Sequence, residues 1–162
     1  MNYYIFRHGK TYFSKNSIPY GDQVETAEIL PEAIPVLEKL AEYLKNIKTD
    51  FNVSSTYLRC RQTVEIVEKI SGKKFEFDPL LHDWDPRNET VEDTAKRIET
   101  FYSNLKTMSY SSVAICAHGY PIAMLKSLIL NGKVELEKIA DYPTTGVLLV
   151  IKDGKVEKIN FN

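Results

Sequence analysis

Cysteine, histidine and long hydrophobic runs are scarce in this chain. Its two cysteines, Cys60 and Cys116, are too few and too far apart for a disulfide framework or a four-ligand zinc site, so we expect free thiols in a reducing compartment. No run of about 18 apolar residues occurs, which excludes a membrane-spanning helix. The N-terminal segment also lacks the basic stretch and apolar run of a signal peptide. These absences favour a cytoplasmic protein without a membrane partner.

An excess of charge of either sign is also absent. Lysine and arginine total 21 against 22 aspartates and glutamates, so the formal net charge is −1 and no overall basic field is available to hold a nucleic acid. The 43% hydrophobic and 27% charged content is typical of a soluble globular protein. At 162 residues we expect one domain, over residues 1–162, with a sizeable core. Nothing in the sequence indicates an oligomeric state.

What is present is an alternation of short apolar runs and amphipathic segments. Apolar runs predict buried strands, and apolar residues three and four positions apart predict helices. The expected strands are at residues 3–6, 50–55, 75–77 and 113–117, the expected helices contain residues 37–47, 64–70, 91–105 and 121–131, and residues 17–23 and 80–88 are expected to be loops.

Local signals support this pattern. Thr90 followed by Asp93 resembles a capping box, and Gly72 and Gly132 follow the apolar stripes of two helices as natural stops. The segment GVLLVIKDGKVEKINF predicts a hairpin about an Asp-Gly turn. Strands alternating with helices predict an α/β fold, a three-layer α/β/α sandwich with a mostly parallel central sheet and an antiparallel C-terminal edge hairpin.

Polar residues follow three of the predicted strands. Arg7 and His8 follow the first strand, residues 54–59 follow the second, and His118 follows the strand at 113–117. Ligands of such sheets bind beyond the carboxyl ends of the strands, so these residues are expected to converge.

The converging residues suit a phosphoryl group. Arg7 and Arg59 offer planar forks that grip phosphate through paired hydrogen bonds. His8 and His118 titrate near neutral pH, so that one ring is an unprotonated nucleophile while the other, protonated, stabilises the phosphoryl oxygens. Gly9, Gly119 and the helix beginning near residue 121 allow backbone amides to approach the anion.

Three motifs, in this order, resemble those of the histidine phosphatase superfamily, the phosphoglycerate mutase-like proteins. RHGKT at residues 7–11 resembles the family's Arg-His-Gly-Glu-Thr, with Lys10 in place of glutamate. SSTYLRCRQTVEI at 54–66 and CAHGYPI at 116–122 resemble its arginine motif and its second His-Gly motif. The segment TVEDTAKRIETFYSNL resembles a helix of the family, so the resemblance extends over the whole chain.

The resemblance implies a metal-independent phosphatase of the small phosphatase branch. His8 would carry a covalent phosphoryl group, which Arg7, Arg59 and His118 would hold. It implies no metal ion or other cofactor, and its substrate would be a phosphorylated small molecule or a phosphoprotein. The residues expected to bind the substrate are Gly9, Thr11, Ser14, Gly119 and Tyr120. The loops themselves offer a candidate aromatic rim of Tyr12, Phe13, Tyr20 and Tyr120.

The proton donor is less well marked. Leu81-His82-Asp83 aligns with the Leu-x-Glu of many members of the family, so Asp83 is the expected acid, although its side chain is one methylene shorter. Asp85 is the alternative. Either carboxyl would need a raised pKa to act as an acid at neutral pH.

Other readings remain open. A catalytically weak or dead module of the same fold that binds phosphate or phosphopeptides is the main alternative. A phosphoglycerate mutase would need insertions that this chain lacks, and a zinc site is disfavoured because His8, His82 and His118 lack zinc-ligand spacing. The short polar loops at 10–25, 78–90 and 119–121 predict an open, shallow site, with His82 in a solvated loop and Lys10 either solvated or facing an anion.

Overall fold

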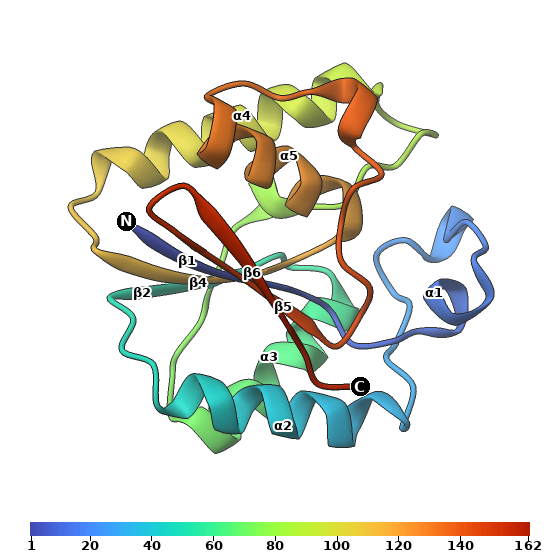
Figure 1. Cartoon of the computed structure of the whole chain (residues 1–162). Coiled ribbons are helices and arrows are strands. Elements are labelled where there is room, and N and C mark those ends of the chain that lie inside the picture. The colour runs from blue at the N-terminus through green and yellow to red at the C-terminus, as the bar shows by residue number, and fades with distance from the viewer.

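A six-stranded sheet forms the centre of the computed structural model, which describes all of residues 1–162. The strand order is β3-β2-β4-β1-β5-β6 (Figure 1). The strands are β1 Asn2–Arg7, β2 Phe51–Ser54, β3 Glu76–Phe77, β4 Ser112–Ala117, β5 Val147–Lys152 and β6 Lys155–Asn160. The four strands β3, β2, β4 and β1 are parallel, whereas β5 pairs with β1 in the antiparallel direction and β6 pairs with β5. The predicted α/β fold with its mostly parallel sheet and antiparallel C-terminal hairpin is confirmed.

Helices cover both faces of the sheet. In Figure 1, α4 and α5 lie above it, and α2 and α3 lie below it. The helices are α1 Tyr12–Asn16, α2 Ala33–Lys45, α3 Leu58–Ser71, α4 Val91–Thr107 and α5 Gly119–Asn131, with short 3-10 helices η1 Gly21–Gln23, η2 Pro79–Leu81 and η3 Leu136–Lys138.

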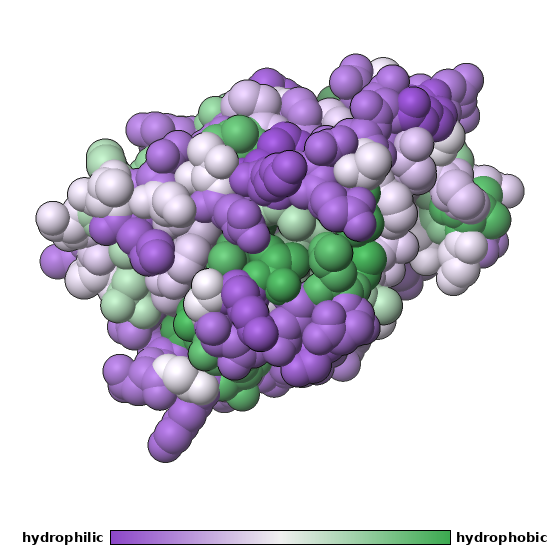
Figure 2. Space-filling model, turned by 90° about the horizontal axis from the view of Figure 1, so that it is seen from above, coloured by the Kyte–Doolittle hydropathy of each residue, from purple (hydrophilic) through white to green (hydrophobic).

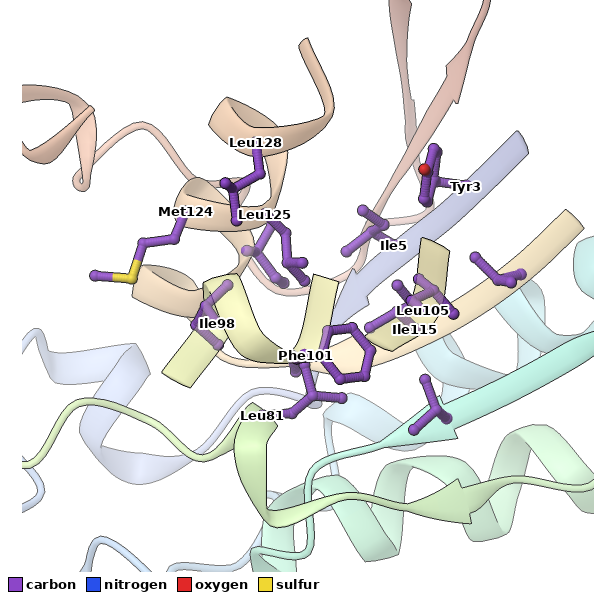
Figure 3. Close-up of a cluster of buried hydrophobic side chains, with 14 of the residues drawn as sticks. Tyr3, Ile5, Leu81, Ile98, Phe101, Leu105, Ile115, Met124, Leu125 and Leu128 are labelled. Carbon is purple, nitrogen blue, oxygen red and sulfur yellow. The ribbon is translucent and has the colours of Figure 1, made fainter. Parts of the chain in front are cut away.

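Each face of the sheet packs against its own hydrophobic cluster, because side chains alternate between the two faces along each strand. From β1, Ile5 points into the cluster under α4 and α5, and Phe6 points into the cluster over α2 and α3. Figure 3 shows the first cluster, in which Leu81 of η2 lies among side chains of α4 such as Ile98 and Phe101. Burial on both faces makes the central strands continuous apolar runs, as β4 is.

The predicted helix caps are present. Thr90 and Asp93 form the reciprocal capping box of α4, and Gly72 and Gly132 end α3 and α5 in the left-handed conformation. Asp153 and Gly154 both have positive φ, 48° and 72°, as a two-residue type I′ hairpin turn requires.

Two boundaries differ from the predictions. The loop expected at residues 17–23 ends in η1 and is preceded by α1, which the sequence reading missed because five residues carry no helical stripe. Helix α5 begins at Gly119, before the expected residue 121, because Pro121 is compatible with a first helical turn.

The outer face of α4 and α5 is mainly hydrophilic. Figure 2 shows this side, where hydrophobic residues appear in limited areas between polar ones. Half-buried side chains that pack against the core beneath include Ile129, Leu130, Val134 and Ile139. No helix in the chain is both apolar and long enough to cross a membrane.

Candidate active site

Arg7, His8, Arg59, Asp83 and His118 meet beyond the carboxyl ends of β1 and β4. The ring centroids of His8 and His118 are 5.4 Å apart. Asp83 Oδ2 lies 3.1 Å from Arg59 Nη2 and 3.9 Å from His118 Nδ1. The structure therefore brings together the residues that the sequence reading grouped.

His8 is fixed by backbone and by its own ring. Its backbone N–H donates to Ala117 O at 3.1 Å, which extends the pairing of β1 with β4 by one residue. The ring Nδ1 lies 2.8 Å from Gly9 O, and since a carbonyl only accepts, Nδ1 carries the proton. The lone pair is thereby assigned to Nε2, the nitrogen available for attack.

The electrostatic surroundings keep His8 neutral. Its ring is 1% exposed, and burial is the main cause that holds its pKa well below the ordinary value. The positive charges of Arg59 and Arg7 lower that pKa further. A neutral imidazole at physiological pH is what a nucleophile requires.

His118 occupies the N-cap position of α5 and is also buried. Its Nε2 lies 2.8 Å from Ser55 Oγ and 3.6 Å from Cys60 Sγ, whereas its Nδ1 has no hydrogen-bond partner. If the Ser55 hydroxyl donates to Nε2, the proton lies on Nδ1, on the side of Asp83.

The surroundings of His118 do not favour the positive charge that the sequence analysis expected on its ring. Burial, followed by the charges of Arg59, His8 and Arg7, lowers the pKa of His118 well below its usual value. These surroundings disfavour the protonated form of His118, so its protonation beside a neutral His8 stays a prediction for the site with a phosphoryl group bound. A neutral His118 still offers one N–H donor.

The two arginines come from different elements. Arg59 lies in the first turn of α3 with no exposed surface, and it donates from Nη1 to Val24 O and from Nη2 to Asp83 Oδ2. Arg7 ends β1 and donates from Nη1 to Pro143 O at 3.2 Å. The Nε atoms of Arg7 and Arg59 are buried and have no partner.

An aromatic ring lies over each guanidinium. Tyr20 lies over Arg59, with 4.0 Å from Cζ to the ring centroid, and Tyr142 lies over Arg7 at 5.0 Å. Such stacking orients the planar forks and excludes water from one side.

The two candidate acids differ sharply. Asp83 faces Arg59 and His118, and burial raises its pKa although Arg59 opposes the rise. Asp85 instead accepts hydrogen bonds from Arg87 and Asn88, which lower its pKa, led by the bond from Arg87. None of the hydrogen bonds or ion pairs of Asp85 reaches the histidines, so geometry favours Asp83.

Thr11 and Ser14 form a structural pair. They make the capping box of α1, and Thr11 Oγ1 lies 2.9 Å from the Tyr20 hydroxyl. Thr11 is buried, so it supports Tyr20 over Arg59 from beneath the rim. Tyr120 packs edge-on between Trp84 and Tyr142, with centroid distances of 5.4 and 5.5 Å.

Both glycines of the His-Gly motifs are packed against protein. A Cβ on Gly9 would lie 2.9 Å from Leu37 Cδ1, and one on Gly119 would lie 2.8 Å from the Tyr142 ring. From the sequence, both glycines were expected to let the backbone approach an anion. In the structure, the space beside them is filled by α2 and by Tyr142. The Gly9 N–H donates to Thr63 Oγ1 at 2.8 Å.

Three other expectations are revised. The sequence predicted an open, shallow site, but the residues at its floor are almost completely buried: His8, Arg59 and His118. His82 is half-buried and stacked on Tyr57 at 4.1 Å, not solvated. Lys10 faces Glu32 at 3.7 Å, so a carboxylate within the chain is its anionic neighbour.

Several residues at the site were not singled out from the sequence. Ser55 lies inside the quoted motif at 54–66, so its hydroxyl beside a strand end was a usable signal. Tyr142 precedes β5 in a segment without any motif, and only the folded chain brings it to Arg7. No group of three or more His, Cys, Asp or Glu side chains is arranged to hold a metal ion.

Comparison with known families identifies the class of protein. The family model described as the histidine phosphatase superfamily (branch 1) matches residues 3–88. The chain belongs to this superfamily, most of whose members are histidine phosphatases. No curated protein sequence matches the chain.

Solved structures share the phosphoglycerate mutase-like fold. The alpha-ribazole phosphatase from Shigella flexneri superposes with a TM-score of 0.78 at 16% identity, over 96% of this chain and 93% of that one. A mycobacterial glucosyl-3-phosphoglycerate phosphatase in complex with VO3 gives 0.78 at 18% identity, over 98% and 96%. A phosphoglycerate mutase from Bacillus anthracis gives 0.72 at 18% identity, over 99% and 93%. At these identities the likeness concerns the fold alone.

Proposed function

We propose that this chain is a metal-independent phosphatase that hydrolyses phosphomonoesters through a phosphohistidine on His8. The observation that carries the proposal is the set of buried polar atoms without a partner: Arg7 Nε, Arg59 Nε and His118 Nδ1. A buried donor without a partner is costly, and all three belong to residues around one point. A phosphoryl group has the acceptor oxygens and the negative charge to satisfy all three.

In the first step, the lone pair of His8 Nε2 attacks phosphorus and the bond to the ester oxygen breaks. Asp83, protonated, gives its proton to the departing oxygen, and an alcohol leaves. Arg7, Arg59 and His118 hold the phosphoryl oxygens, whose charge is spread in a loose transition state. Burial, which raises the pKa of Asp83, favours the protonated form that this step needs.

In the second step, the carboxylate of Asp83 accepts a proton from water while the water oxygen attacks phosphorus. The bond between phosphorus and His8 Nε2 breaks, and inorganic phosphate and the neutral imidazole are released. Asp83 thus returns to its protonated form, and the proton balance closes over one turnover. A bound phosphoryl dianion would raise the pKa of His118, so that its protonation would accompany binding.

A small phosphorylated molecule is the substrate class that we favour. The fold neighbours named above include an alpha-ribazole phosphatase and a glucosyl-3-phosphoglycerate phosphatase, both named for small phosphate esters. A protein-bound phosphate, phosphohistidine included, is the alternative substrate. In either case we place the site within a single domain formed by residues 1–162.

The test is hydrolysis of p-nitrophenyl phosphate in EDTA, combined with trapping of the phosphorylated protein. We expect vanadate-sensitive activity and an acid-labile, alkali-stable phosphoryl group in the wild type. Both should be absent in His8→Asn and retained in His82→Asn, a matched histidine outside the phosphate site. Activity that survives in His8→Asn would overturn the mechanism. Binding of vanadate without any hydrolysis would instead favour a phosphate-binding module.

A further inference from the structure

One further arginine lies behind the proposed acid. Arg97, on α4, points to the loop between η2 and α4 that carries Asp83. Its Nη1 donates to Leu80 O at 2.8 Å and to His82 O at 3.0 Å, and its Nη2 donates to Asp83 O at 3.3 Å. One guanidinium therefore holds three carbonyls within four residues of chain, including the carbonyl of the acid itself.

Glu89 holds Arg97 in turn. Its carboxylate accepts from Arg97 Nε at 3.2 Å and also from Nη2, and it accepts from Thr94 Oγ1 at 2.7 Å. The backbone oxygen of Glu89 accepts from the indole N–H of Trp84 at 3.1 Å. The ion pair of Arg97 and Glu89 is three-quarters or more buried, which strengthens it relative to an exposed pair.

The same helix holds the loop by apolar contact. Leu81 is completely buried in the cluster that contains Ile98 and Phe101 of α4 (Figure 3). Arg97 and Ile98 are adjacent, so one turn of α4 provides both a polar and an apolar anchor for residues 80–83. Neither anchor touches the phosphate site.

We propose that Arg97 is a positioning residue that sets the reach of Asp83 toward the leaving oxygen. The inference rests on the proposed function, in which Asp83 is the acid. An aspartate has no spare length, so a displaced backbone cannot be recovered by a different rotamer, and a misplacement of about 1 Å costs on the order of 10²-fold in rate. The multiple carbonyl contacts of Arg97 are the only side-chain hydrogen bonds to the backbone oxygens of residues 80, 82 and 83.

Substrates with different leaving groups distinguish a residue that positions the acid from one that only stabilises the fold. Departure of an alkoxide depends on the proton from Asp83, whereas p-nitrophenolate departs without one. A residue that positions the acid should therefore matter for alkyl phosphates and matter little for p-nitrophenyl phosphate. A residue that only stabilises the fold should affect both substrates equally.

The experiment compares Arg97→Gln with Arg87→Gln, which breaks the ion pair of the same loop with Asp85. For Arg97→Gln we expect kcat/KM on an alkyl phosphate such as glycerol phosphate to fall by about 10- to 100-fold, with a much smaller change in kcat/KM on p-nitrophenyl phosphate and in vanadate inhibition. The comparison uses kcat/KM because it reports the steps through departure of the alcohol or phenol, whereas kcat also includes the attack of water, in which Asp83 acts on the same phosphohistidine whatever the substrate. Arg87→Gln should leave the ratio of kcat/KM for the two substrates unchanged. Arg97→Lys, which keeps the charge but not the fork, should recover part of the loss.

Equal losses of kcat/KM on both substrates, or no loss on either, would overturn the inference. Should Arg97→Gln not fold, Glu89→Gln loosens the same guanidinium and the same selectivity is expected. Asp83→Asn distinguishes the two proposals: if it shows no selective loss on alkyl phosphates, the assignment of the acid fails. If Asp83→Asn shows the selective loss and neither Arg97→Gln nor Glu89→Gln does, only the positioning role fails.

Discussion

The strand ends and the acid loop hold their side chains in different ways. Arg7 and His8 leave β1 where its backbone is paired in register with β4, Arg7 opposite Ala117, and His118 follows β4 directly. Asp83 has no such ladder beside it, and its position depends on side chains, on Arg97 behind it and Arg59 in front. Backbone pairing therefore fixes the proposed phosphate site, whereas side-chain packing fixes the proposed acid.

This difference has consequences for mutation. At the strand ends, loss of a side chain should remove a chemical group and leave its neighbours in place. In the acid loop, loss of a supporting side chain should move a chemical group that is still present. The predictions below test this contrast.

The largest effect is expected for Arg59→Gln. We expect kcat/KM for p-nitrophenyl phosphate to fall by about 10³-fold, because one preorganised donor to a developing oxyanion is worth ~10²–10³ in rate. Vanadate inhibition should weaken in parallel. The control is Arg61→Gln, since Arg61 is exposed in the same helix and donates to Thr56 O at 2.7 Å. Near-normal activity of Arg59→Gln would contradict its place among the phosphate ligands.

Asp83→Asn should give the next largest effect, and a selective one. We expect kcat/KM on an alkyl phosphate to fall by about 10²-fold, the lower end for general acid catalysis, with a smaller loss of kcat/KM on p-nitrophenyl phosphate. Vanadate should bind more tightly, because the carboxylate that pairs with Arg59 is removed. Weaker vanadate binding in this variant would show that Asp83 supports the anion site instead of competing with it.

The pH profile provides the third prediction. His8 must be neutral, and its pKa is lowered, so the acidic limb should lie below the ordinary histidine value of about 6.5. Asp83 must be protonated, and its pKa is raised, so alkyl phosphatase activity is present below that pKa and falls as pH rises through it, by about tenfold per unit. Measurements of kcat/KM on an alkyl phosphate across pH should show both limbs. Asp83→Asn should lose the basic limb, and persistence of that limb would assign it to another group.

Ser55→Ala should give the smallest effect. Its hydroxyl is 2.8 Å from His118 Nε2 and is the nearest hydrogen-bonding group to that nitrogen. Loss of one buried hydrogen bond, about 1 kcal/mol, corresponds to a decrease in kcat of about fivefold to tenfold. Ser54→Ala removes a neighbouring buried hydroxyl, which donates to Ser55 O, and serves as the control. An equal loss in both variants would indicate a general packing effect.

Most of the fold could be predicted because its signals are local. The apolar run of β4, the Thr90 capping box and the Asp153-Gly154 turn each specify an element without reference to the rest of the chain. Helix α1 was missed, although Thr11 and Ser14 form a capping box there, because five residues show no period.

From the pattern of strands and helices, only the part of the site that lies at the strand ends could be predicted. Arg7, His8 and His118 follow parallel strands, so their proximity followed from topology. The Leu-x-Glu resemblance already favoured Asp83 as the acid, whereas the contact that holds Asp85 at Arg87 is one between loop side chains that no pattern specifies. The same is true of Tyr142 over Arg7, and of Arg97, whose carbonyl partners exist only once the loop is folded.

Thr63 couples parts of the site that different elements supply. Its hydroxyl accepts from Gly9 N–H at 2.8 Å and donates to Arg59 O at 2.7 Å, so a single oxygen connects the backbone after His8 to the first turn of α3. The relative position of the proposed nucleophile, His8, and Arg59 therefore depends on this one shared contact. For protein engineering, this means that new specificity is better sought in α1 and around Tyr142 than at His8 and Arg59, where a change at one residue would also displace the other.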